Sequence, residues 1–78
     1  MISYLCFDLY LDKKLGGYIL VLKDTDYTQK ELYKVLQDIK LNITKHNKLL
    51  VIGFIPEIKN HLKFYTRLGS KVIYELTS

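Results

Sequence analysis

Residues 49–55 read Leu-Leu-Val-Ile-Gly-Phe-Ile, a run without a single polar side chain. Successive side chains of a β-strand point to opposite faces of its sheet, so a strand that is apolar on both phases is expected to be covered on both faces. The chain has 78 residues, and a domain of this size buries only about 60% of the surface that its unfolded chain exposes. We therefore expect residues 1–78 to form a single domain with a small core, and residues 49–55 to form the centre of its sheet.

Two more apolar segments lie near the N-terminus. The odd positions from Leu5 to Leu11 are apolar, which is the alternation of a half-buried strand, here expected over residues 2–11. Residues 18–22 form an unbroken apolar run, and the Asp-Lys-Lys-Leu-Gly-Gly sequence between the two segments has the composition of a turn. The two segments are therefore predicted to pair as an antiparallel hairpin.

A first helix is expected after this hairpin. Thr28 and Glu31 match a capping box, in which the threonine hydroxyl and the glutamate carboxylate each accept a hydrogen bond from a backbone N–H at the start of the helix. Apolar residues follow at helical spacing, which predicts an amphipathic helix over residues 28–45. The stripe comprises Leu32, Val35, Leu36, Ile39 and Ile43.

A second helix is expected after the central strand. Pro56 suits the first turn of a helix, where its missing N–H would have no partner within the helix. Gly69 suits the position after a helix end, where a left-handed residue is common. The second helix is therefore predicted over residues 56–68, followed by a last strand over residues 72–76.

These elements follow the order β-β-α-β-α-β, which predicts an α+β, two-layer domain with a four-stranded mixed sheet. Right-handed crossovers in one direction place both helices on the same face of the sheet. The other face would then expose apolar residues of the second and third strands, among them Ile19, Val21, Leu50 and Ile52. Since exposed apolar patches mark interaction sites, we expect a homodimer or a protein partner that covers this bare face.

The order of elements over residues 18–75 resembles the second half of a GNAT N-acetyltransferase domain. Residues 49–55 resemble the central strand of that family, and residues 64–69, Phe-Tyr-Thr-Arg-Leu-Gly, resemble a family helix ending of the form Phe-Tyr-x-x-Leu-Gly. The resemblance implies a GNAT-like half domain from a family that transfers an acyl group from coenzyme A to an amine. It also implies that Tyr65 is the catalytic acid that protonates the departing thiolate.

The chain departs from the family pattern at the coenzyme loop. The family has an Arg/Gln-x-x-Gly-x-Gly/Ala loop there, whose backbone N–H groups hold the coenzyme A pyrophosphate at the start of a helix. This chain reads Leu-Lys-Asp-Thr-Asp-Tyr-Thr-Gln-Lys-Glu-Leu over residues 22–32, with no glycine and two aspartates. By resemblance, the coenzyme-binding positions are Tyr27, Thr28 and Gln29. No cofactor is therefore expected, or acetyl-coenzyme A if the chain is an enzyme.

A basic stripe is expected on the outward face of the second helix. Lys59, Lys63 and Arg67 are spaced by four residues, and Lys71 follows just beyond. With a net charge of +4, such a stripe suits an acidic protein surface or a nucleic-acid backbone. Lysine supplies all but one of the 12 basic residues, which weakens the nucleic-acid interpretation because bidentate phosphate and guanine contacts favour arginine.

Other classes of protein are excluded or disfavoured by composition. No run approaches the roughly 20 apolar residues of a membrane span, and no basic segment precedes the N-terminal apolar run as in a signal peptide, so Met1 is expected to begin a protein without membrane contact. One cysteine, Cys6, cannot form an internal disulfide, which favours a cytoplasmic location. His46 and His61 have no neighbours at metal-ligand spacing, so no metal site is predicted.

Three functions remain as hypotheses. The preferred one is a GNAT-like protein without acetyltransferase activity that acts as a dimeric protein-binding or regulatory module. The second is a minimal acetyl-coenzyme A-dependent N-acetyltransferase that is completed by dimerisation. The third is a basic nucleic-acid-binding module.

Overall fold

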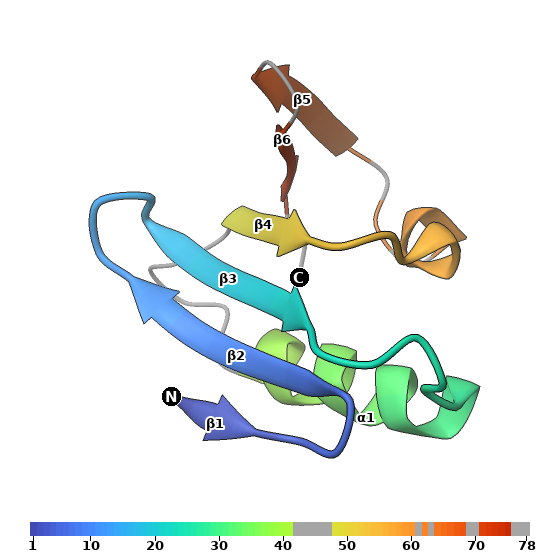
Figure 1. The fold of residues 1–78 in the computed structure, drawn as a ribbon. Helices are drawn as coiled ribbons and strands as arrows, with labels where there is room; N and C mark the ends of the chain where they lie inside the picture. Colours follow the sequence, from blue (N-terminus) through green and yellow to red (C-terminus); the bar gives the residue numbers. More distant parts are fainter. Residues whose placement is uncertain (42–47, 61, 63, 69–70, 76–78) are drawn as a thin grey trace.

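A computed structural model describes residues 1–41, 48–60, 62, 64–68 and 71–75. Its strands form one six-stranded mixed sheet in the order β1-β2-β3-β4-β6-β5, and helix α1 (Gln29–Leu41) packs on one face (Figure 1). The remaining elements are β1 (Ile2–Ser3), β2 (Phe7–Asp12), β3 (Gly17–Leu22), β4 (Lys48–Ile52), the 3-10 helix η1 (Pro56–Asn60), β5 (Phe64–Leu68) and β6 (Lys71–Glu75). The predicted α+β class and mixed sheet are confirmed, whereas the predicted four strands and two α-helices are wrong.

The predicted N-terminal hairpin is confirmed as the antiparallel pair of β2 and β3. Its turn is held by the backbone N–H of Gly16, which donates to the carbonyl of Asp12 at 3.1 Å. Gly16 has a φ of 73°, in the left-handed region that glycine enters without steric penalty. The Asp12 carboxylate also accepts from the backbone N–H of Lys14 at 2.9 Å, so the aspartate and the glycine together fix the turn.

The strand predicted over residues 2–11 is divided into β1 and β2, which pair with each other as a short antiparallel ladder. The backbone N–H of Tyr4 donates to the carbonyl of Phe7 at 2.8 Å and closes the turn between them. Leu5 lies in this turn and is 88% exposed, although the alternation predicted it on the core face. A period-2 pattern shows which residues share a face of a continuous strand, but it does not reveal where the chain reverses.

The capped helix is confirmed as α1, although its described part begins one residue later and ends at Leu41. The Thr28 hydroxyl accepts from the backbone N–H of Glu31 at 3.1 Å, as the capping box predicts. The Glu31 carboxylate accepts from the backbone N–H of Cys6 at 2.7 Å, which ties the start of α1 to the chain segment before β2. The rest of the predicted helix, including Ile43, lies outside the described residues.

The second predicted helix is wrong. Among the described residues of this region only η1 is helical, and the Phe-Tyr-Thr-Arg-Leu segment is strand β5, antiparallel to β6. Aromatic and β-branched residues in this segment favour a strand, and its ladder with β6 runs from Phe64 opposite Glu75 to Leu68 opposite Lys71. Gly69, which was predicted to follow the end of this helix, lies outside the described residues.

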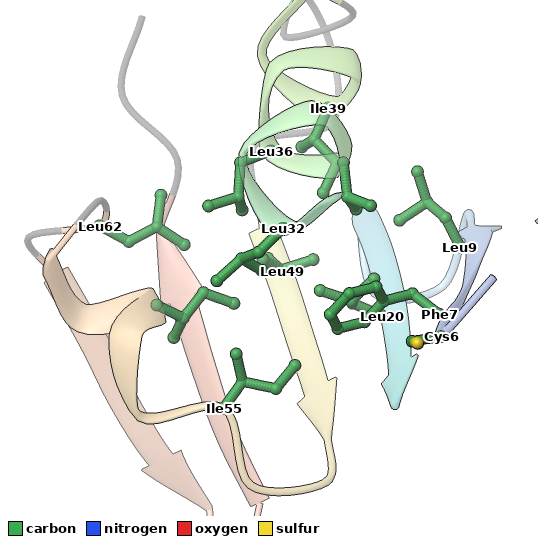
Figure 2. Packing of buried hydrophobic residues seen from close by; sticks show 12 residues of the cluster. Cys6, Phe7, Leu9, Leu20, Leu32, Leu36, Ile39, Leu49, Ile55 and Leu62 are labelled. Atoms are coloured by element: carbon green, nitrogen blue, oxygen red, sulfur yellow. The ribbon is translucent and has the colours of Figure 1, made fainter. Parts of the chain in front are cut away.

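The core lies between one face of the sheet and α1 (Figure 2). Phe7, Leu20 and Leu49 from three adjacent strands are fully buried against the apolar stripe of the helix. Ile58 of η1 belongs to the same buried cluster, so both helical segments pack on this covered face. The cluster comprises Cys6, Phe7, Leu9, Leu20, Leu32, Val35, Leu36, Ile39, Leu49, Ile55, Ile58 and Leu62.

Candidate functional site

The opposite face of the sheet carries a row of apolar side chains that remain accessible to solvent. The register aligns Tyr10 of β2 with Ile19 of β3, Ile19 with Leu50 of β4, and Leu50 with Ile73 of β6. Aligned residues of neighbouring strands point to the same face of a sheet, so these four side chains form one row across four strands. Tyr10 is 38% exposed, and the other three are partly exposed.

A second row lies beside the first, where Asp8, Val21 and Ile52 are aligned across β2, β3 and β4. Ile52 is 48% exposed and Val21 is partly exposed. The apolar surface formed by both rows is called the open face below. It comprises Tyr10, Ile19, Val21, Leu50, Ile52 and Ile73.

The open face is a consequence of two strands that are apolar on both phases. In β4, Leu49 is fully buried under α1, whereas its neighbour Leu50 points away from the helix and is partly exposed. In β3, Leu20 and Ile19 show the same division between a buried and a partly exposed side chain. The prediction that helical elements cover one face and leave apolar residues on the other therefore holds for the part of the chain that the structure describes.

Charged residues lie at the two ends of the open face and are locally balanced. At one end, Lys23 Nζ lies 3.1 Å from Asp8 Oδ1, and the Ser3 hydroxyl donates to the same oxygen at 2.8 Å. The hydrogen bond from Ser3, together with Lys23, lowers the pKa of Asp8. At the other end, Lys48 of β4 is aligned with Glu75 of β6, so opposite charges are neighbours across the strands.

A second candidate region surrounds the start of α1, where the resemblance places coenzyme-binding residues. The Tyr27 hydroxyl donates to Glu57 Oε2 of η1 at 2.5 Å, and its ring packs on Phe7 with centroids 5.2 Å apart. Burial and this hydrogen bond raise the pKa of Tyr27 to about 12. Hydrogen bonds from Tyr27 and Gln29 lower the pKa of Glu57, so a carboxylate favoured in its charged form lies beside the start of α1.

The loop before α1 adds acidic groups to this region. Asp24 lies in this loop, where its carboxylate accepts from the backbone N–H of Asp26 at 2.9 Å. The backbone N–H groups of Lys23 and Asp24 both donate to the carbonyl of Cys6, so the chain leaves β3 on the side of β2. The sequence indicated Tyr27, Thr28 and Gln29 but not Glu57, because no local pattern connects Tyr27 with a residue 30 positions away.

The pairing of β3 with β4 is continuous along the strands beside this region. Their parallel register runs from Gly17 opposite Lys48 to Val21 opposite Ile52. A coenzyme slot between these strands would require them to separate near the start of α1. Within the described strands, no such separation interrupts the ladder.

Tyr65, the catalytic acid implied by the resemblance, lies in β5 with its backbone opposite that of Tyr74 in β6. The resemblance had placed Tyr65 on a helix. Tyr65 is not brought beside Tyr27 by any described pairing, because β5 is the edge strand beyond β6. Its role as an acid stays a prediction.

The predicted basic stripe does not lie along a helix. Lys59 is exposed on η1, which ends at Asn60, while Arg67 belongs to β5 and Lys71 to β6. Lys63 lies outside the described residues. The spacing of four residues therefore does not align these positions on one helical face, and their binding of a partner stays a prediction.

Neither the cysteine nor the possible metal ligands form a further site among the described residues. Cys6 is buried, and burial together with the nearby Glu31 carboxylate raises the pKa of its thiol. No group of three histidine, cysteine, aspartate or glutamate side chains in the described ranges could hold a metal ion. The helices in those ranges are also too short or too polar to span a membrane.

Comparisons of the chain with models of protein families, with curated proteins and with solved structures found no match.

Proposed function

We propose that the chain is a reduced GNAT-like scaffold that binds another protein chain through its open face and does not transfer acetyl groups. The open face is the observation that carries this proposal. Apolar side chains cross four adjacent strands there without interruption. Contiguous exposed patches of this kind mark interaction surfaces, because covering them removes apolar area from water.

The surroundings of α1 support the absence of acetyl transfer. A pyrophosphate at a helix N-terminus needs backbone N–H groups within reach and favours positive charge nearby. Here the Tyr27 side chain and the Glu57 carboxylate are held together beside the first turn of α1. A polyphosphate would meet the side chain of an aromatic residue and the negative charge of a carboxylate, so these residues do not fit coenzyme A.

A calorimetric titration with acetyl-coenzyme A tests the proposed lack of catalysis. We expect no heat of binding at micromolar protein and no release of free coenzyme A with amine acceptors. The Glu57→Gln variant serves as the matched control, since it removes the charge while keeping a side chain of the same shape. A clear heat signal from the unaltered chain, with a micromolar dissociation constant, would refute this part of the proposal.

Two neighbouring leucines test whether the open face is available to a partner. Leu49→Lys places a charge in the core, where its side chain is fully buried, and is expected to unfold the protein. Leu50→Lys places the same charge on the open face and is expected to leave the circular dichroism spectrum of the folded protein unchanged. Loss of the folded spectrum in both variants would show that Leu50 is covered within the chain itself.

A further inference from the structure

We infer that the partner of the open face is a second copy of this chain, which packs sheet against sheet about a two-fold axis. This inference rests on the proposed binding function and identifies its partner. In such an interface the same surface meets itself, so the surface must be compatible with its own copy in shape and charge. The charge and the strand register of the open face are compatible with its own copy.

The size of the open face limits the area that a second copy can bury there. Four strands spaced about 4.8 Å apart, with about five residues each at a rise of about 3.3 Å, cover roughly 300 Å² in plan. This area is smaller than the roughly 800 Å² that each partner buries in an interface of standard size, so a second copy would also contact side chains at the margins of the face. A second copy of this chain presents an apolar area of equal extent.

The charges of the open face favour a copy of itself over a strongly charged partner. Asp8 is neutralised by Lys23 at 3.1 Å, and Lys48 is aligned with Glu75 across the strands. The chain as a whole has a net charge of +4, yet the described side chains of this face form no block of like charge that would repel its copy. An acidic or basic partner would find no extended charge of opposite sign to recognise here.

The apolar rows are also compatible with sheet-to-sheet packing. Their members stand on a regular ladder from β2 to β6, where neighbouring strands hold them in register. Two such faces can pack about 10 Å apart, with the side chains of one filling spaces between those of the other. Leu50 of β4 lies in the central part of the face, with Ile19 and Ile73 on either side.

Sedimentation equilibrium of the unaltered chain and two variants tests the second-copy interface. We expect the unaltered chain to be dimeric at micromolar concentration and Leu50→Lys to be a folded monomer, with dimerisation weakened by about a hundredfold or more because a lysine would be buried without a partner. Leu41→Lys is the matched control, because Leu41 is 80% exposed at the end of α1. It should dimerise as the unaltered chain does.

A mixing experiment distinguishes self-association from binding of another protein. Leu50→Lys and Leu50→Glu should each be monomeric alone, and should form a mixed dimer when combined, because opposite charges then meet across the axis. A monomeric unaltered chain would overturn the second-copy inference while leaving the open face as a site for another protein. A dimeric Leu50→Lys variant would also overturn it, since the dimer would then use another surface. Binding of acetyl-coenzyme A would instead contradict the proposed function, whatever the oligomeric state.

Discussion

The contact between Gly17 and Lys48 leads to a strong prediction about stability. Gly17 begins β3 and is aligned with Lys48 at the start of β4, where the two parallel strands first pair. A Cβ atom added to Gly17 would lie 2.0 Å from the carbonyl oxygen of Lys48 and 2.6 Å from its carbonyl carbon. The obstructing atoms are backbone atoms, so they cannot move aside by a change of rotamer. We therefore predict that Gly17→Ala weakens the β3–β4 pair.

The magnitude follows from the size of the overlap. Ordinary contact begins near 3.4 Å, so the strands would have to separate by about 1.4 Å at this end, the difference between 3.4 and 2.0 Å. Overpacking in a well-packed region costs about 1 to 3 kcal/mol, and a lost backbone hydrogen bond adds about 1 kcal/mol. The reduced freedom of the unfolded chain offsets about 0.4 to 1 kcal/mol. The expected net loss is about 1 to 4 kcal/mol, a large part of the roughly 4 to 12 kcal/mol typical of a domain this size.

Urea denaturation followed by circular dichroism measures this loss. The neighbouring Gly16→Asn variant is the control, because no atom lies within 4 Å of an added Cβ at Gly16 and its φ is +73°. Asparagine tolerates this left-handed conformation, so the control should lose less than about 1 kcal/mol. Equal free energies of unfolding for Gly17→Ala and the unaltered protein would show that β3 and β4 do not approach each other as the structure describes.

Two further predictions concern the core and the acidic region beside α1. Leu32 is fully buried, so Leu32→Ala should lower the free energy of unfolding by about 2 to 5 kcal/mol. Leu41 is 80% exposed, so Leu41→Ala should change the free energy of unfolding by less than about 0.5 kcal/mol. Similar urea midpoints for the two variants would contradict the described packing of α1. The hydrogen bond from Tyr27 lowers the pKa of Glu57 from its ordinary value of 4.5, so the unfolded chain takes up this proton first as the pH falls, and stability present above pH 4.5 should be lost as the pH falls through the lowered pKa. As the pH falls through this acidic range, the urea midpoint should fall less steeply for Glu57→Gln than for the unaltered chain. The remaining slope arises in part from Asp38, whose pKa is also lowered. If the urea midpoints of the two proteins depend on pH in the same way, Glu57 does not contribute to the pH dependence.

Strong local patterns predicted the first half of the fold. The turn residues before Gly17 and the apolar runs on either side of them predicted the β2–β3 hairpin. Thr28 and the stripe after it predicted α1, since a cap and a 3.6-residue period both act within a few residues. The division of the first predicted strand was missed, because the turn after Ser3 contains no glycine, proline, asparagine or aspartate to indicate it.

The second half was predicted less well because its structure depends on distant pairing. Pro56 correctly indicated the start of a helical turn. Strand β5, however, forms through its ladder with β6, and a helical spacing of apolar residues within residues 56–68 could not exclude that ladder. The candidate sites follow the same division. The open face was predicted from strands apolar on both phases, whereas the contact of Tyr27 with Glu57 was missed because tertiary packing alone brings them together.

The short helical segment η1 does not cover the open face. Helix α1 has 13 residues, and at about 1.5 Å per residue it is about 20 Å long, which is enough to cover one face of β2, β3 and β4. The η1 segment adds Ile58 to the same covered face, so it supplies nothing to the other. Both β3 and β4 nevertheless carry apolar side chains on both faces of the sheet. A sheet that is covered on one face only does not require apolar side chains on the other. Ile19 and Leu50 are partly exposed, so polar residues at these positions would cost less stability than polar residues in the core and would make the chain more soluble. Their apolar character therefore favours a second layer over the open face, and a second copy of the chain supplies one of matching size and balanced charge.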